Sequence, residues 1–173
     1  SCRESMTFQR IMVPLDGSVF GEHALPHAVH LARRSGALLE LVHVLVQPYQ
    51  FERSAGPGSL SADPSVAATS RFQAQVYLTS LVRQVSDAAP GLEVRMCLLE
   101  GVVDRGLCEY IDASKPDLLV LTTHGRGPLS RMWHGSIATR LVQSVAAPLL
   151  LVRPKEDPPN LHADINMRCI LVA

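Results

Sequence analysis

The order of segments along the chain predicts an α/β protein with a doubly wound, five-stranded parallel sheet and helices on both faces. Five apolar segments of strand length alternate with four segments of helical character. The strand-like segments are almost continuously apolar, as is typical of parallel strands buried on both faces. Regular alternation of strand and helix is the pattern of doubly wound sheets.

The first strand and helix occupy the N-terminal part of the sequence. Residues 9–15 are apolar and predict a buried strand. A set of apolar residues with helical spacing follows and predicts a helix that ends at Gly36. The set is Ala24, Leu25, Ala28, Leu31 and Ala32. Pro26 supplies no N–H, so we expect it to perturb the first turns of this helix.

The next segments enclose an unusually long connection. Residues 37–46 predict the second strand. Residues 47–64 contain prolines and glycines among serines and predict a loop, of a length typical of lids or disordered segments. Residues 65–89 predict a long helix that Pro90-Gly91 stops.

The second half of the sequence repeats the alternation. Residues 92–100 predict a strand and residues 103–115 a helix. Residues 117–123 predict a strand, residues 136–146 a helix, and residues 149–152 the final strand.

Composition limits the class of protein and its partners. The chain of 173 residues suits one domain with a substantial core. Its 16 basic and 16 acidic side chains balance, which argues against nucleic acid or an anionic membrane as the main partner. We find no membrane-spanning run and no signal-peptide pattern, and expect a cytoplasmic location. The four cysteines form no CxxC pair, so we expect reduced, buried thiols.

A glycine-rich turn between a strand and a helix is the most informative motif. It runs from Thr122 to Ser136, after the apolar residues 118–121 and before the helical residues 137–142. Glycines leave backbone N–H groups unobstructed, and Ser136 adds a hydroxyl where a helix would begin, so the turn has the parts of a phosphate site. It matches neither the P-loop nor the dinucleotide-binding fingerprint.

The motif resembles the glycine signature of the universal stress protein family. That signature is a glycine, two residues, a second glycine, nine residues, and then Gly-Ser or Gly-Thr. Here Gly125 is followed by nine residues and Gly135-Ser136, but Thr122 replaces the first glycine. The resemblance covers residues 8–154. Other segments that carry it are Ile11–Ser18, Leu41–Val44, Glu100-Gly101 and Pro148–Arg153.

The resemblance implies a strand order of 3-2-1-4-5 and a site for ATP, with or without Mg²⁺, at the carboxyl ends of the first and fourth strands. Asp16 would face the ribose and Val44 the adenine. The phosphates would be lined by Thr122, Gly125, Arg126, Gly127, Gly135 and Ser136. Simpler interpretations stand beside these: Asp16 as a turn or helix cap, the glycines as turn formers, and the arginines as solvated loop residues.

Thr122 and the histidines leave alternatives open. A β-branched Thr122 either crowds the phosphates or contacts one through its hydroxyl. His23, His27 and His30 have the spacing of a metal-binding pair, but nothing completes the ligand set, so a solvated helix face or an interface is favoured. His43, within an apolar strand, is expected to be a packed, hydrogen-bonded histidine.

The function implied by the resemblance is a cytoplasmic stress-response regulator or scaffold that binds ATP. The alternatives are an interaction module that binds no nucleotide, and a slow ATP-hydrolysing enzyme, although no catalytic motif is visible. The family's dimers form through the last strand, which implies a homodimer or an equivalent pairing of tandem domains. Residues 155–173 are interpreted as a linker and the orphan first strand of a missing second copy, because residues 167–173 repeat the pattern of residues 8–14.

Overall fold

The fold is a parallel sheet of five strands in the order β3-β2-β1-β4-β5. The computed structural model describes residues 8–46, 64–122, 141, 145–163 and 165. Its strands are β1 (Arg10–Leu15), β2 (Leu38–Leu45), β3 (Val94–Glu100), β4 (Leu118–Thr122) and β5 (Leu149–Val152). The predicted fold class and strand order are therefore confirmed.

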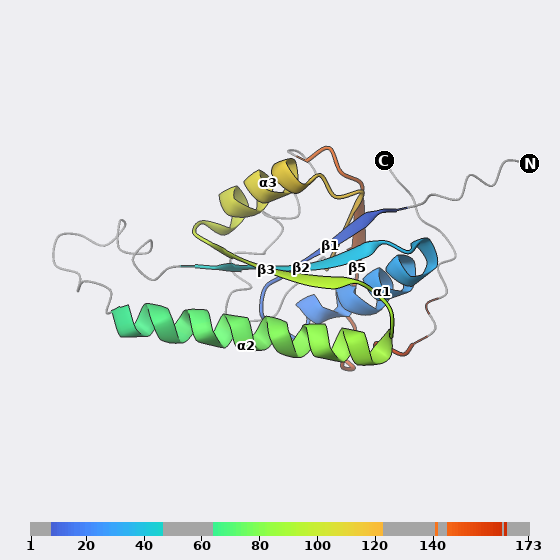
Figure 1. Ribbon diagram of the computed structural model, residues 1–173, viewed down its shortest axis with the longest axis horizontal. Coiled ribbons are helices and arrows are strands. Elements are labelled where there is room, and N and C mark those ends of the chain that lie inside the picture. Colours follow the sequence, from blue (N-terminus) through green and yellow to red (C-terminus); the bar gives the residue numbers. More distant parts are fainter. Residues whose placement is uncertain (1–7, 47–63, 123–140, 142–144, 164, 166–173) are drawn as a thin grey trace, which may run out of the picture.

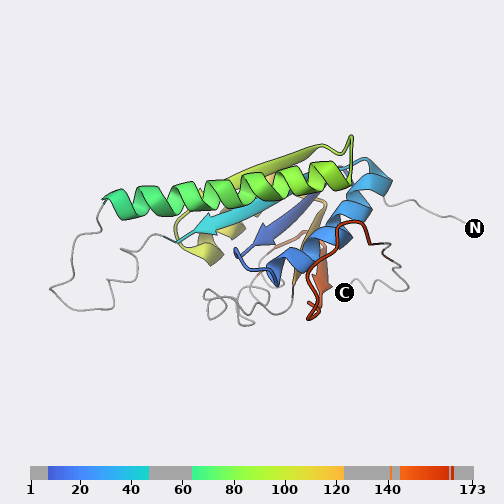
Figure 2. The same cartoon turned by 90° about the horizontal axis from the view of Figure 1, so that it is seen from below.

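Helices cover both faces of the sheet (Figures 1 and 2). They are the short 3₁₀ helix η1 (Gly21–His23), α1 (Ala24–Ser35), α2 (Pro64–Ala88) and α3 (Val103–Ser114). Figure 1 shows α1 and α2 below the sheet and α3 above it. Most of the helix expected at 136–146, and residues 47–63 of the expected loop, lie outside the described residues.

Alternation along each strand divides the apolar side chains between two cores. In β1, Ile11 and Val13 belong to the core under α1 and α2, whereas Met12 packs with α3. In β4, Val120 belongs to the first core and Leu121 to the second. Because successive side chains of a strand point to opposite faces, a continuously apolar strand is buried on both sides.

The beginning and end of α1 follow from single residues. The chain enters α1 through η1, and Pro26 is the third residue of α1, where a missing N–H leaves no hydrogen bond unmade within the helix. α1 is helical from Ala24 through Pro26, so the expected perturbation does not interrupt its first turns. Gly36 ends α1 in the left-handed conformation with φ 69°, which glycine adopts without steric cost.

The segment after β5 turns back over α1, as the two views of the red trace show (Figures 1 and 2). The main-chain oxygen of Asp157 lies 2.8 Å from Nε2 of His23. Leu161 packs against the core that α1 and α2 cover. The first part of the expected linker is thus held against the domain, while residues 167–173 lie outside the described residues.

Candidate functional site

The strand order reverses between β1 and β4, and the hydrogen-bonded ladder between these two strands is short. It joins Ile11 to Leu118 and Met12 to Leu119. By contrast, β1 pairs with β2 along its whole length, as far as Leu15 opposite His43. The carboxyl ends of β1 and β4 are therefore not joined by this ladder, at the topological switch point where open α/β sheets bind ligands.

Pro14 gives a physical reason for the early end of this ladder. The Gln9 carbonyl accepts a hydrogen bond from Leu38 of β2, and the Arg10 carbonyl accepts one from Asp117, which precedes β4, each at 2.9 Å. Backbone groups of successive strand residues face alternate neighbours, so the nitrogen of Pro14 faces β4, like that of Met12. A proline nitrogen carries no hydrogen, and β1 has no donor to offer β4 at that point.

Asp16 follows the end of β1 and organises the turn into η1. Its side chain is 7% exposed. Oδ1 accepts hydrogen bonds from the backbone N–H of Ser18 at 2.9 Å and from the Ser18 hydroxyl at 2.6 Å. This is an Asx turn, so the simpler interpretation of Asp16 as a turn former is correct. Both bonds end on Oδ1, which leaves Oδ2 as the oxygen that a ligand hydroxyl would approach.

Gly21 is fitted against this carboxylate. A Cβ added at position 21 would overlap Oδ1 of Asp16. Gly21 is not among the glycines with positive φ, so space and not backbone conformation accounts for glycine here. The N–H of Gly21 also donates to the Ser18 hydroxyl at 3.1 Å. Sequence analysis missed the roles of Ser18 and Gly21, although Asp16 itself is the usual signal of an Asx turn to the N–H two residues on.

A half-buried acidic side chain lies beside the turn. Burial raises the pKa of Glu22, and the negative charge of Asp16 raises it further, while Tyr77 and His23 oppose the shift. The buried Tyr77 hydroxyl lies near the Glu22 carboxylate, and the interaction between them lowers the pKa of Glu22. Its burial and the Glu22 charge raise the pKa of Tyr77, so this phenol stays neutral.

Val44 and Thr122 are the other expected site residues that the structure describes. Val44 is buried near the end of β2, in the core that α3 covers. Thr122 is half-buried at the end of β4, opposite Val152. Asp16, Val44 and Thr122 thus lie at the carboxyl ends of three adjacent strands. The remaining expected residues lie outside the described part of the chain: Gly125, Arg126, Gly127, Gly135 and Ser136.

Two of the three expected histidines, His23 of η1 and His27 of α1, contact main-chain oxygens. The ring nitrogens of His23 lie 3.0 Å from the Val19 oxygen and 2.8 Å from the Asp157 oxygen. Nδ1 of His27 lies 3.2 Å from the His23 oxygen. Within the described ranges no three His, Cys, Asp or Glu side chains are grouped to hold a metal ion.

The surroundings of His43 and of the described cysteines indicate structural roles. His43 is buried, donates from Nδ1 to the Leu15 oxygen at 2.8 Å, and meets the Tyr77 ring edge-on, which confirms the expectation of a packed histidine. Cys97 and Cys108 are free thiols and are half-buried, so they are less enclosed than expected. Burial, followed by the Asp112 charge, raises the pKa of Cys108, which disfavours the reactive thiolate.

Comparison with known proteins identifies the class to which this fold and glycine-rich turn belong. Residues 7–153 match the universal stress protein family, and the chain belongs to that family. It is 26% identical over 152 residues to a universal stress protein of Methanocaldococcus jannaschii, covering 87% of this chain and 85% of that protein. A universal stress protein of Mycolicibacterium smegmatis is also 26% identical, over 84% of this chain but only 46% of its own length.

Solved structures share the fold at lower sequence identity. The universal stress protein UspA from Lactobacillus plantarum superposes with a TM-score of 0.65 at 21% identity, covering 86% of this chain and 100% of that one. A universal stress protein in complex with cAMP gives 0.62 at 21%, covering 86% and 99%. An Arabidopsis thaliana family protein with AMP bound gives 0.59 at 15%, covering 86% and 93%. Among the described residues, no helix has both the length and the apolar character needed to cross a membrane.

Replacing Pro14 by valine should extend the ladder between β1 and β4. Valine keeps an apolar side chain of similar size and adds the N–H that proline lacks, directed toward β4. We expect the new amide at position 14 to be protected from hydrogen exchange as strongly as that of Met12, measured by NMR. Exchange at the rate of an unstructured amide would contradict the proposed cause of the strand separation.

Replacing Glu22 by glutamine should stabilise the protein at neutral pH. A carboxyl group with a raised pKa favours the folded state when protonated, and this contribution is lost as pH rises through the folded-state pKa. The variant lacks that loss, so its melting temperature should exceed the wild-type value at pH 7 and match it at pH below 4.5, the ordinary pKa of glutamate. Glu109→Gln, at an exposed position of α3, is the control and should not show this pH-dependent gain.

Proposed function

We propose that this chain binds an adenine nucleotide at the carboxyl ends of β1, β2 and β4. The observation that carries the proposal is the place of Asp16, Val44 and Thr122 at the ends of adjacent strands, where the strand order reverses and the β1–β4 ladder has stopped. Family members of the same fold with cAMP and with AMP bound support it, as does a third from Archaeoglobus fulgidus in complex with dAMP.

ATP, with or without Mg²⁺, is the ligand we infer for the intact site. In this proposal Oδ2 of Asp16 accepts from a ribose hydroxyl and Val44 lies against the adenine. In the same proposal, the backbone N–H groups of the glycine-rich segment after Thr122 hold the phosphates together with Ser136. The protein would then act in the cytoplasm as a nucleotide-dependent regulator or scaffold in the stress response.

A second candidate is an interaction module that binds no nucleotide. It is favoured by the turn itself, because Asp16 is 7% exposed and Oδ1 is already occupied by Ser18. Thr122, where the family signature has glycine, also brings a β-branched side chain to the expected phosphate site. A third candidate, slow ATP hydrolysis, is separated from simple binding by an assay for released phosphate.

Calorimetric titration with AMP and ATP distinguishes these candidates. Asp16→Ala removes a charged acceptor and should weaken binding by about 1.5–3 kcal/mol. Ser18→Ala is the matched control, because it removes the two hydrogen bonds of the Ser18 hydroxyl but keeps the carboxylate, and its affinity should stay closer to wild type. If Thr122 crowds the phosphates, Thr122→Gly should tighten ATP binding, and if its hydroxyl contacts them, binding should weaken. Absence of binding in both wild type and Thr122→Gly would replace the nucleotide proposal with the interaction module.

We also propose that the chain self-associates through β5, or pairs in this way with a second domain of the same kind. β5 is an edge strand of the sheet, and Leu151 within it is 45% exposed. Apolar edge strands favour pairing with another chain. The proposal of a tandem protein rests on residues 167–173, which repeat the first-strand pattern, and agrees with the M. smegmatis relative, of whose length the match spans about half.

Leu151→Lys should disrupt this association. A lysine at the centre of the edge strand places a charge where two apolar strands would meet. Light scattering at micromolar concentration should show a dimer for wild type and a monomer for the variant. Val76→Lys, at an exposed apolar position of α2, is the control and should remain dimeric. A wild-type chain that is monomeric under these conditions would contradict the proposal.

A further inference from the structure

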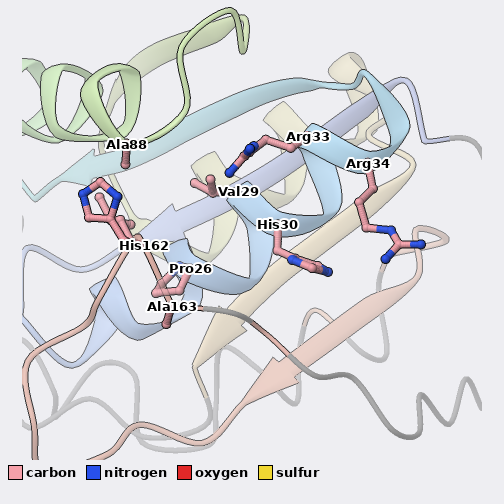
Figure 3. A pocket seen from close by; sticks show the side chains of 9 residues that line it. Pro26, Val29, His30, Arg33, Arg34, Ala88, His162 and Ala163 are labelled. Carbon is pink, nitrogen blue, oxygen red and sulfur yellow. The ribbon is translucent and has the colours of Figure 1, made fainter.

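A cavity lies along α1 and shares no residue with the proposed nucleotide site. Its volume is about 390 Å³, within the range of small-molecule sites. Figure 3 shows the side chains around it. The lining residues come from α1, from the end of α2 and from the segment after β5: Pro26, Val29, His30, Arg33, Arg34, Ala88, Leu161, His162 and Ala163.

The charged side chains that line this cavity are all of one kind. Arg33, Arg34, His30 and His162 carry or can take a positive charge, and no carboxylate lines the cavity. The chain as a whole is balanced, with 16 basic and 16 acidic side chains, so the cavity departs from the average surface. The ion pairs of the described residues involve other arginines, and neither Arg33 nor Arg34 has a described carboxylate within pairing distance.

The surrounding helix face has a positive field as well. His27, between the cavity residues Pro26 and Val29, has a lowered pKa, caused first by burial. A hydrogen bond to the His23 oxygen opposes this shift, and the charges of Lys155, His30 and His23 add to it. Basic residues in the last turn of a helix are favoured by its dipole, which accounts for two arginines at the end of α1. The dipole does not account for a cavity beside them that a separate segment helps to enclose.

The segment after β5 forms the other wall, and its position is fixed by specific contacts. Leu161 is packed against the core. The N–H of His162 donates to Oδ1 of Asn160 at 3.0 Å, and the N–H of Ala163 donates to the Asn160 carbonyl at 3.2 Å. This turn holds His162 at the cavity. Residues 161–163 follow the part of the chain that matches the family, so the cavity depends on a segment outside that match.

We propose that this cavity binds a small organic phosphate, with the phosphate between Arg33 and His162. Figure 3 shows Arg33 extending from α1 toward the side on which Ala88 and His162 lie. The planar guanidinium of arginine matches the oxygens of a phosphate and can donate two parallel hydrogen bonds. Arg34 and His30 strengthen the positive potential, and Pro26, Val29 and Leu161 give the organic part an apolar wall. This proposal does not depend on adenine-nucleotide binding at the carboxyl ends of β1, β2 and β4.

Inorganic pyrophosphate is the probe for the test, because it carries the proposed charge without a base. NMR signals of the His162 ring and the Arg33 guanidinium report on this cavity and not on the proposed nucleotide site. We expect both signals to shift saturably as pyrophosphate is added at low ionic strength. Arg33→Gln and His162→Ala should each weaken pyrophosphate binding. The His162 signal reports on the arginine variant, and the Arg33 signal reports on the histidine variant. Arg33→Gln should weaken binding by about tenfold or more, since a hydrogen-bonded charge is lost.

Arg83→Gln is the matched control. Arg83 is an exposed arginine of α2 that does not line the cavity, and glutamine is a good helix former at either position. Its affinity for pyrophosphate should equal that of wild type, and all variants should keep the wild-type melting temperature within a few degrees. The proposal is overturned if the His162 and Arg33 signals do not shift saturably, or if Arg83→Gln weakens binding as much as Arg33→Gln.

Discussion

The arrangement of the proposed nucleotide site depends on the place where the main-chain ladder between β1 and β4 stops. These strands are neighbours at the reversal of strand order, yet they pair only at Ile11 and Met12 of β1. A sheet bonded to its last residue at this point would draw Asp16 and Thr122 together through backbone hydrogen bonds. Pro14 removes one donor from this stretch of β1 with no loss of burial, because it remains in the core while offering no N–H to β4.

The Asp16 turn is closely packed around its carboxylate. Ser18 fixes one carboxylate oxygen by two hydrogen bonds, and Gly21 allows η1 to begin directly against it. A carboxylate held in this way does not have to lose rotational freedom when a ligand approaches, so its second oxygen is preorganised. The turn and the binding role are therefore compatible, although the occupied Oδ1 also suits an interaction module.

Much of the fold could be predicted from sequence because the strands are short apolar runs bounded by clear turn and helix signals. The boundaries of β1, β2 and α3 follow from such patterns to within one or two residues. The order of the strands came from the family resemblance and not from periodicity, since parallel strands carry no local signal of their neighbours. The Glu22–Tyr77 pair, the close approach of Gly21 and the contact of His23 with Asp157 depend on tertiary packing, and no spacing in the sequence announces them.

Helix α1 connects the proposed nucleotide site to the basic cavity. Its 3₁₀ entry begins at the glycine that packs on Asp16, and its last turn carries Arg33 and Arg34 beside the basic cavity. Between them, His23 bridges the Val19 oxygen, in the Asp16 turn, and the Asp157 oxygen, in the segment after β5. That segment then supplies Leu161 to the core and His162 to the cavity. Residues beyond the family match thus contact the turn of the proposed nucleotide site at one end and line the basic cavity at the other, and α1 is the element common to both.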